Sequence, residues 1–226
     1  MWIFNSSIGR KLIMSLSGLF LISFLIVHLS ANLALLAGTG GATSVEEIPY
    51  NVVCHFMDTN PFIMVMVPVL ALGFIVHIVY AFILTARNRK ARGNDRYASS
   101  SKTNISWASK NMFVLGIIVL GFLGLHLVHF WAKMQLQHFI GGTPDANAYQ
   151  LAVNLFTNPA YVVIYIIWIW ALWFHLTHGF WSAFQSMGLN NHNWMPRWKA
   201  LGSVLATLIA VGFTIIPLFF LFGFGQ

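Results

Sequence analysis

The chain has 226 residues, of which 58% are hydrophobic and only 8% are charged, whereas about 25% of the residues of an ordinary soluble domain carry a charge. This composition argues against a water-soluble fold, and the length leaves no room for a separate soluble catalytic domain. The formal charge of +7 does not indicate nucleic-acid binding, because most basic residues flank apolar segments and act there as topological anchors.

Five apolar segments predict five transmembrane helices, since each is near or above the roughly 20 residues that cross a bilayer. In chain order, we expect the helices at about 12–37, 61–86, 108–133, 159–186 and 200–223. The first segment is too long for the apolar region of a signal peptide, so we expect it to be retained. The fold class is therefore all-α, a single transmembrane domain over residues 1–226.

The basic residues predict the orientation of these helices. Eleven of the twelve fall on one side of the predicted membrane: Arg10, Lys11, Arg87, Arg89, Lys90, Arg92, Arg96, Lys102, Lys110, Arg197 and Lys199. The other side carries Lys133 among several acidic residues. The positive-inside rule then places the N-terminus in the cytoplasm and the C-terminus outside, and we expect a multi-pass protein of a bacterial cytoplasmic membrane.

The only cysteine is Cys54, so the chain can form no internal disulfide and has no CxxCH site for covalent haem. The histidines are more informative. His28, His77, His129 and His175 lie one per segment in the first four apolar segments, and ionisable residues within a bilayer are rare and usually functional. A polar contact between helices would explain one such histidine better than it explains four.

The depths of these histidines predict two pairs. At about 1.5 Å per residue, His28 and His129 lie about 26 and 28 Å from the basic inner ends of their helices. His77 lies about 15 Å from Arg87, and His175 lies about 15 Å from Gln185, the expected inner boundary of its helix. This favours His28 with His129 near the outer surface and His77 with His175 nearer the cytoplasm, each pair able to hold a haem. A tetrahedral zinc site fits poorly, because its ligands must converge within about 2.1 Å of one ion.

Several short motifs, met in a fixed order, point to a family. They are Ser-Gly-Leu-Phe at 17–20, Leu-Ile-Val-His-Leu at 25–29, His-Phe-Met-Asp at 55–58, Ile-Val-His at 75–77, Lys-Asn-Met-Phe-Val-Leu at 110–115, His-Phe-Trp at 129–131 and Phe-His-Leu-Thr-His-Gly-Phe-Trp-Ser at 174–182. With them, nearly the whole chain resembles the di-haem cytochrome b subunit of succinate:quinone oxidoreductases and quinol:fumarate reductases, the type with one large five-helix anchor.

The resemblance implies that four of the five helices enclose two b haems and that the four paired histidines are the axial ligands of the haem irons. Ser15 matches a position near the propionates of the inner haem. His126 and His178 each lie three residues from a ligand, and we expect neither to bind iron. Some fumarate reductases of the family carry a glutamate two residues before the fourth ligand as a proton route; Trp173 stands there instead, which predicts that this route is absent.

The resemblance also implies partners: a flavoprotein with FAD and an iron–sulfur subunit on the cytoplasmic side, which exchange electrons through the haems with a quinone, expected to be menaquinone. His55 and Asp58 in the first outer loop are candidates for a quinone site, although they could equally cap the next helix. The alternatives are another di-haem cytochrome b, of the hydrogenase, formate dehydrogenase or ascorbate-linked type, and a transporter with a histidine proton relay.

Overall fold

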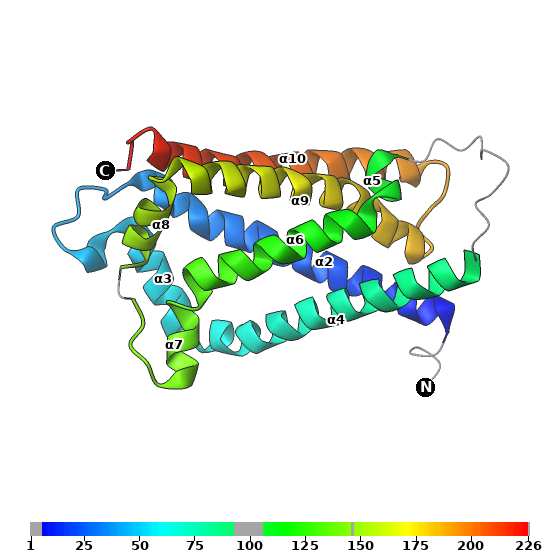
Figure 1. Ribbon diagram of the computed structural model, residues 1–226, viewed down its shortest axis with the longest axis horizontal. Coiled ribbons are helices and arrows are strands. Elements are labelled where there is room, and N and C mark those ends of the chain that lie inside the picture. Colours follow the sequence, from blue (N-terminus) through cyan, green and yellow to red (C-terminus); the bar gives the residue numbers. More distant parts are fainter. Residues whose placement is uncertain (1–5, 93–105, 146, 226) are drawn as a thin grey trace.

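The computed structural model describes residues 6–92, 106–145 and 147–225, and all regular secondary structure in these ranges is helical. Five helical segments are long and apolar enough to cross a membrane: Ser7–Ala37, Pro61–Ala91, Met112–Trp131, Pro159–Ser186 and Trp194–Leu221. They run side by side along the long axis of the molecule (Figure 1). The predicted all-α fold with five membrane-length helices is confirmed.

These segments are built from α2 (Ser7–Asn32) with η1 (Leu33–Ala37), α4 (Pro61–Arg92), α6 (Met112–His126) with η3 (Leu127–Trp131), α9 (Pro159–Ser186) and α10 (Trp194–Leu221). Short helices lie between them: η2 (Val45–Glu47), α3 (Pro49–Thr59), α5 (Trp107–Lys110), α7 (Gln135–Ile140) and α8 (Ala148–Phe156). The N-terminal end of α2 and the C-terminal end of α10 lie at opposite ends of the bundle (Figure 1).

The Asn-Pro pairs at 60–61 and 158–159 start α4 and α9, because the asparagine side chain caps the first turn of each helix. The Asn158 side chain accepts a hydrogen bond from the backbone N–H of Ala160 at 2.9 Å, and Asn60 accepts one from Phe62 at the same distance. Proline follows each asparagine at the first helical position, where its missing N–H costs nothing. The same Asn-Pro chemistry thus opens α4 and α9.

α4 and α10 extend beyond the predicted apolar segments into basic residues that pack against aromatic rings. α4 continues to Arg92, and the Arg89 guanidinium lies 5.0 Å from the centre of the Phe113 ring. α10 begins at Trp194, whose ring lies 5.0 Å from the Arg197 guanidinium. Such aromatic and cationic residues suit a membrane interface. Arg96 and Lys102 lie outside the described residues.

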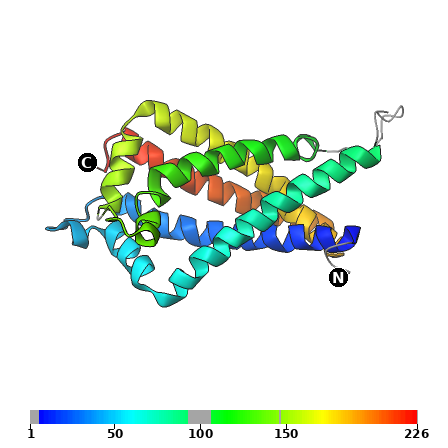
Figure 2. The ribbon, with the colours of Figure 1, turned by 60° about the horizontal axis from the view of Figure 1, so that its bottom comes forward.

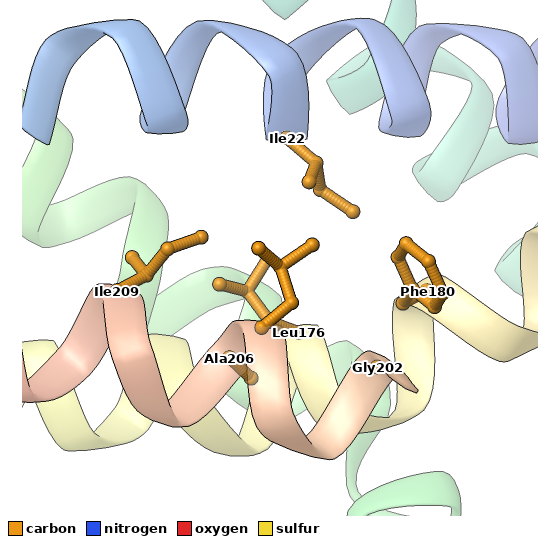
Figure 3. A pocket seen from close by; sticks show the side chains of 7 residues that line it. Ile22, Leu176, Phe180, Gly202, Ala206 and Ile209 are labelled. Atoms are coloured by element: carbon orange, nitrogen blue, oxygen red, sulfur yellow. The ribbon is translucent and has the colours of Figure 1, made fainter. Parts of the chain in front are cut away.

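A buried apolar core joins α2, α9 and α10. Ile22, Leu176, Phe180, Ala206 and Ile209 form a buried apolar cluster between these three helices, and Figure 3 shows Ile22 of α2 pointing toward Leu176 and Phe180 of α9. Gly202 allows the close approach of α10 to α9, since a β-carbon there would lie 2.8 Å from Phe180 Cδ1. Small residues at a contact are the usual means by which membrane helices pack closely.

A second cluster closes the end of the bundle at which α9 begins and α10 ends, called the outer end below because the sequence predicts that it lies outside; the opposite end is called the inner end. In this cluster, short helices pack on the ends of α9 and α10. Asn51 of α3 accepts a hydrogen bond from the Tyr149 backbone N–H at 2.9 Å and donates to the Asn147 side chain at 3.1 Å. The Tyr149 hydroxyl donates to the Gly225 carbonyl at 2.7 Å. These bonds tie the first outer loop and the C-terminal end to α8.

The α4 and α6 side of the bundle is loosely packed. No residue in the apolar stretch of α4 is buried, compared with 33% of the residues in that of α10. α4 packs mainly against α2, and in both views its N-terminal end lies away from the C-terminal end of α10 (Figures 1 and 2). Lipid contact explains the apolar positions of α4, but it does not explain a histidine among them.

Candidate functional site

His77 of α4 and His175 of α9 face each other across the inner half of the bundle. Their ring centres are 6.4 Å apart and the ring planes are inclined by 66°. Two imidazoles bound to opposite sides of one metal ion, with nitrogen–metal bonds of about 2 Å, would have ring centres roughly 6 Å apart. The spacing of this pair therefore matches that of two axial ligands.

α2 and α6 make room for these two rings. A β-carbon on Gly18 of α2 would lie 3.3 Å from His77 Cε1, and one on Gly116 of α6 would lie 3.7 Å from His175 Cε1. The glycines four residues from each histidine in the sequence do not face these rings: a β-carbon on Gly73 would meet Phe20, and one on Gly179 would meet Met112. Which glycine faces a histidine depends on helix rotation, which the sequence does not reveal.

The hydrogen bonding of the two inner imidazoles differs. Ser17 Oγ lies 3.3 Å from His77 Nδ1 and also donates to the Met14 carbonyl at 3.1 Å. His175 Nδ1 is buried, and no hydrogen-bond partner for it exists among the described residues. The same is true of His178 Nδ1, and buried polar atoms without a partner are rare in native proteins.

The other inner residues singled out from the sequence have structural contacts. The Ser15 hydroxyl is buried and donates to the Lys11 carbonyl at 2.8 Å. The His178 ring packs edge-on against Trp181 with ring centres 4.7 Å apart. Trp173 donates its indole N–H to Thr207 of α10 at 3.0 Å, so it faces that helix.

In the outer half, the structure places His126 beside His28. Their ring centres are 5.8 Å apart and nearly perpendicular, and Phe24 stacks on His28 at 5.1 Å. His126 Nδ1 is buried and, within the described residues, has no hydrogen-bond partner. His126 thus faces His28 in the outer half of the bundle, as His175 faces His77 in the inner half.

His129 points toward α9 instead. Its Nδ1 lies 3.0 Å from the Tyr165 hydroxyl, its ring stacks on Tyr165 at 6.0 Å, and Tyr161 packs against its edge. The reason is that η3, which contains His129, is a π-helical turn. Because a π-turn closes over five residues and not four, residues three apart share a face less well than in an α-helix. No sequence signal marked this turn.

Asp58 belongs to a polar cluster at the outer end of the bundle. Of this cluster, the sequence analysis predicted only His55 and Asp58. Gln135 of α7 donates a hydrogen bond to Asp58, and His55 and His138 lie near enough to act on its charge. Partial burial raises the pKa of the Asp58 carboxyl, and His138, Gln135 and His55 oppose the rise. Gln135 and His138 escaped prediction because α7 lacks the length and apolar pattern of a transmembrane segment.

A polar link joins α3 to His28. The Tyr50 hydroxyl donates to Asn32 Oδ1 at 3.3 Å. Asn32 Nδ2 donates to the His28 carbonyl at 2.7 Å and lies 3.3 Å from His28 Nδ1. On the next turn of α3, burial raises the pKa of the Cys54 thiol to about 11, so Cys54 stays a neutral thiol.

The donor set fits haem better than a bare metal ion. Among the described residues, no three His, Cys, Asp or Glu side chains converge as a metal-ion site requires. Pairs of imidazoles are what a haem iron needs, because the macrocycle supplies its other ligands. The spacing of His77 and His175 and the flanking Gly18 and Gly116 agree with such a group.

One curated protein is similar to this chain over most of its length: the succinate dehydrogenase cytochrome b558 subunit of Bacillus subtilis (strain 168). The two are 24% identical over 208 residues, which cover 92% of this chain and 89% of that protein. No protein-family model matches the chain, and no solved structure matches it. The similarity supports a membrane cytochrome b subunit of a succinate dehydrogenase complex.

Proposed function

We propose that this chain is the membrane-anchor cytochrome b subunit of a succinate dehydrogenase or fumarate reductase. It carries electrons through two b haems between a cytoplasmic iron–sulfur subunit and a membrane quinone, with menaquinone as the expected quinone. The dicarboxylate chemistry takes place on a partner flavoprotein that holds FAD. The chain lies in a bacterial cytoplasmic membrane with its N-terminus inside and its C-terminus outside.

The observation that carries this proposal is that two pairs of imidazoles lie at different depths in one helical bundle. His77 and His175 hold the inner haem. Opposite His28, the chain offers two ligands for the outer haem: His129, which its motif predicts, and His126, which the ring geometry favours. A haem in each place supplies one-electron transfer, and two of them at different depths connect the inner and outer surfaces.

The protein controls this transfer through the surroundings of the ligands. The four histidines come from four different helices, so the packing of the bundle sets the distance and the tilt of each pair. The apolar surroundings exclude water and, with the hydrogen bonds to the ligands, tune the haem potentials. The basic residues at the inner ends of the helices lie where an iron–sulfur subunit would dock, and they also suit contact with anionic lipids.

Copurification tests the proposed function. We expect a tagged chain, solubilised in mild detergent, to bring with it a flavoprotein with FAD and an iron–sulfur subunit, and to contain two haems b per chain by the pyridine haemochrome assay. A haem spectrum with other partners would indicate a different di-haem cytochrome. A preparation without haem would contradict the cytochrome assignment and favour a transporter.

We further propose that Asp58 and His55 serve an outer quinone site, where Asp58 exchanges protons with the quinone. The support is the cluster around Asp58, in which Gln135 orients the carboxyl while His55 and His138 lie close to it. A carboxyl with a raised pKa is better able to donate and regain a proton near neutral pH. Asp58→Asn keeps the size of the side chain and an oxygen that can accept from Gln135, but it removes the titratable group.

Asp58→Asn is expected to lower quinone-dependent succinate turnover about 100-fold, as loss of a general acid or base typically does, with both haems retained. The alkaline limb of the pH profile, where Asp58 loses the proton that it must donate to the quinone, should disappear with it. Succinate oxidation by an artificial acceptor that takes electrons before the haems is the control and should be unchanged. Normal quinone turnover in the variant would remove Asp58 from the site and leave it a loop-capping residue.

A further inference from the structure

We infer that the Ser17 hydroxyl is a positioning group for His77: it accepts the hydrogen bond of Nδ1–H, which leaves the Nε2 lone pair free for the haem iron and strengthens it as a donor. This inference rests on the proposed function, because it takes His77 as an axial ligand. Ser17 differs from Ser15, the serine expected to lie near the haem propionates.

The local geometry favours this direction of the hydrogen bond. A serine hydroxyl has one hydrogen and two lone pairs. Ser17 Oγ lies 3.1 Å from the Met14 carbonyl, to which it donates, and 3.3 Å from His77 Nδ1. With its hydrogen directed to Met14, Oγ has only lone pairs to offer His77, so Nδ1 carries the proton.

The position of Ser17 suits this task. It is buried, with 9% of its surface exposed, and it lies on α2, whereas His77 lies on α4. The next residue is Gly18, where a β-carbon would come within 3.3 Å of His77 Cε1. Ser17 therefore holds one edge of the imidazole while Gly18 leaves room for the ring, and together they set its rotation.

A bond of this kind has a predictable effect on the haem potential. When Nδ1–H donates to an oxygen, the imidazole becomes a stronger donor to the metal. A stronger donor stabilises ferric over ferrous iron and lowers the midpoint potential. His175 has no such bond among the described residues, so the effect of Ser17 falls on one ligand of the inner haem only.

The test is a potentiometric titration of the purified complex, followed through the haem absorption bands. In Ser17→Ala the midpoint potential of the inner haem is expected to rise, while that of the outer haem, measured in the same sample, stays in place. Ser17→Thr keeps a hydroxyl and should restore the wild-type potential. Ser23→Ala, the same change at an exposed position of α2, should match the wild type.

Several results would overturn the inference. They are an unchanged inner potential in Ser17→Ala, an equal shift of both haems, or the same shift in Ser17→Thr as in Ser17→Ala. If Ser17→Ala fails to retain haem, Ser17→Cys provides the second test, because a thiol has nearly the same volume as the hydroxyl but is a weak hydrogen-bond acceptor. A wild-type potential of the inner haem in Ser17→Cys would also overturn the inference. Absence of haem from the wild-type complex would instead contradict the proposed function.

Discussion

Complexes that carry His77→Ala or His175→Ala are expected to contain one haem per chain where the wild type contains two. Each change removes one axial ligand of the inner pair, whose ring centres lie 6.4 Å apart, and alanine offers the iron no replacement. The outer haem should remain, because its ligands lie in the outer half of the bundle, on α2 and on the segment formed by α6 and η3. The pyridine haemochrome assay, normalised to protein, measures this loss directly.

His192→Ala is the matched control, since it removes an exposed histidine from the connection between α9 and α10. It should leave both haems in place. The assignment of the inner pair fails if His77→Ala or His175→Ala retains two haems per chain. A variant that loses both haems calls for a check of assembly: if the complex is intact, the two haem sites are not independent.

The second large effect concerns the outer haem. His28→Ala and His126→Ala are expected to remove it, whereas His129→Ala should leave it in place with a shifted potential. The reason is geometric: the His126 ring lies 5.8 Å from that of His28, while His129 stacks on Tyr165 and lies within hydrogen-bonding distance of its hydroxyl. Redox spectra resolve which haem is lost.

The opposite outcome, with the outer haem lost in His129→Ala and kept in His126→Ala, would support the ligand that the His-Phe-Trp motif predicts. It would also mean that haem binding rearranges the π-turn of η3, because His129 would have to leave Tyr165 and turn toward α2. The two variants change the same residue type three positions apart, so each serves as the control for the other.

The sequence predicted the long helices well for a simple reason. A bilayer requires about 20 apolar residues per crossing and satisfied backbone hydrogen bonds, so composition alone reveals the spans. The Asn-Pro pairs at 60–61 and 158–159 marked two helix starts, since both residue types act locally. α3, α7 and α8 were missed because short helices at a membrane surface leave no comparable apolar run.

Depth could be counted along the chain, so the sequence by itself determined an all-helical membrane protein and grouped its intramembrane histidines into an inner and an outer set. A fixed rise per residue makes height along a helix nearly independent of the neighbouring helices. Rotation about the helix axis has no such independence, because it depends on packing and on local turns such as η3. Only the tertiary structure therefore decided that His126 faces His28, that Ser17 meets His77, and that Gln135 of α7 reaches Asp58.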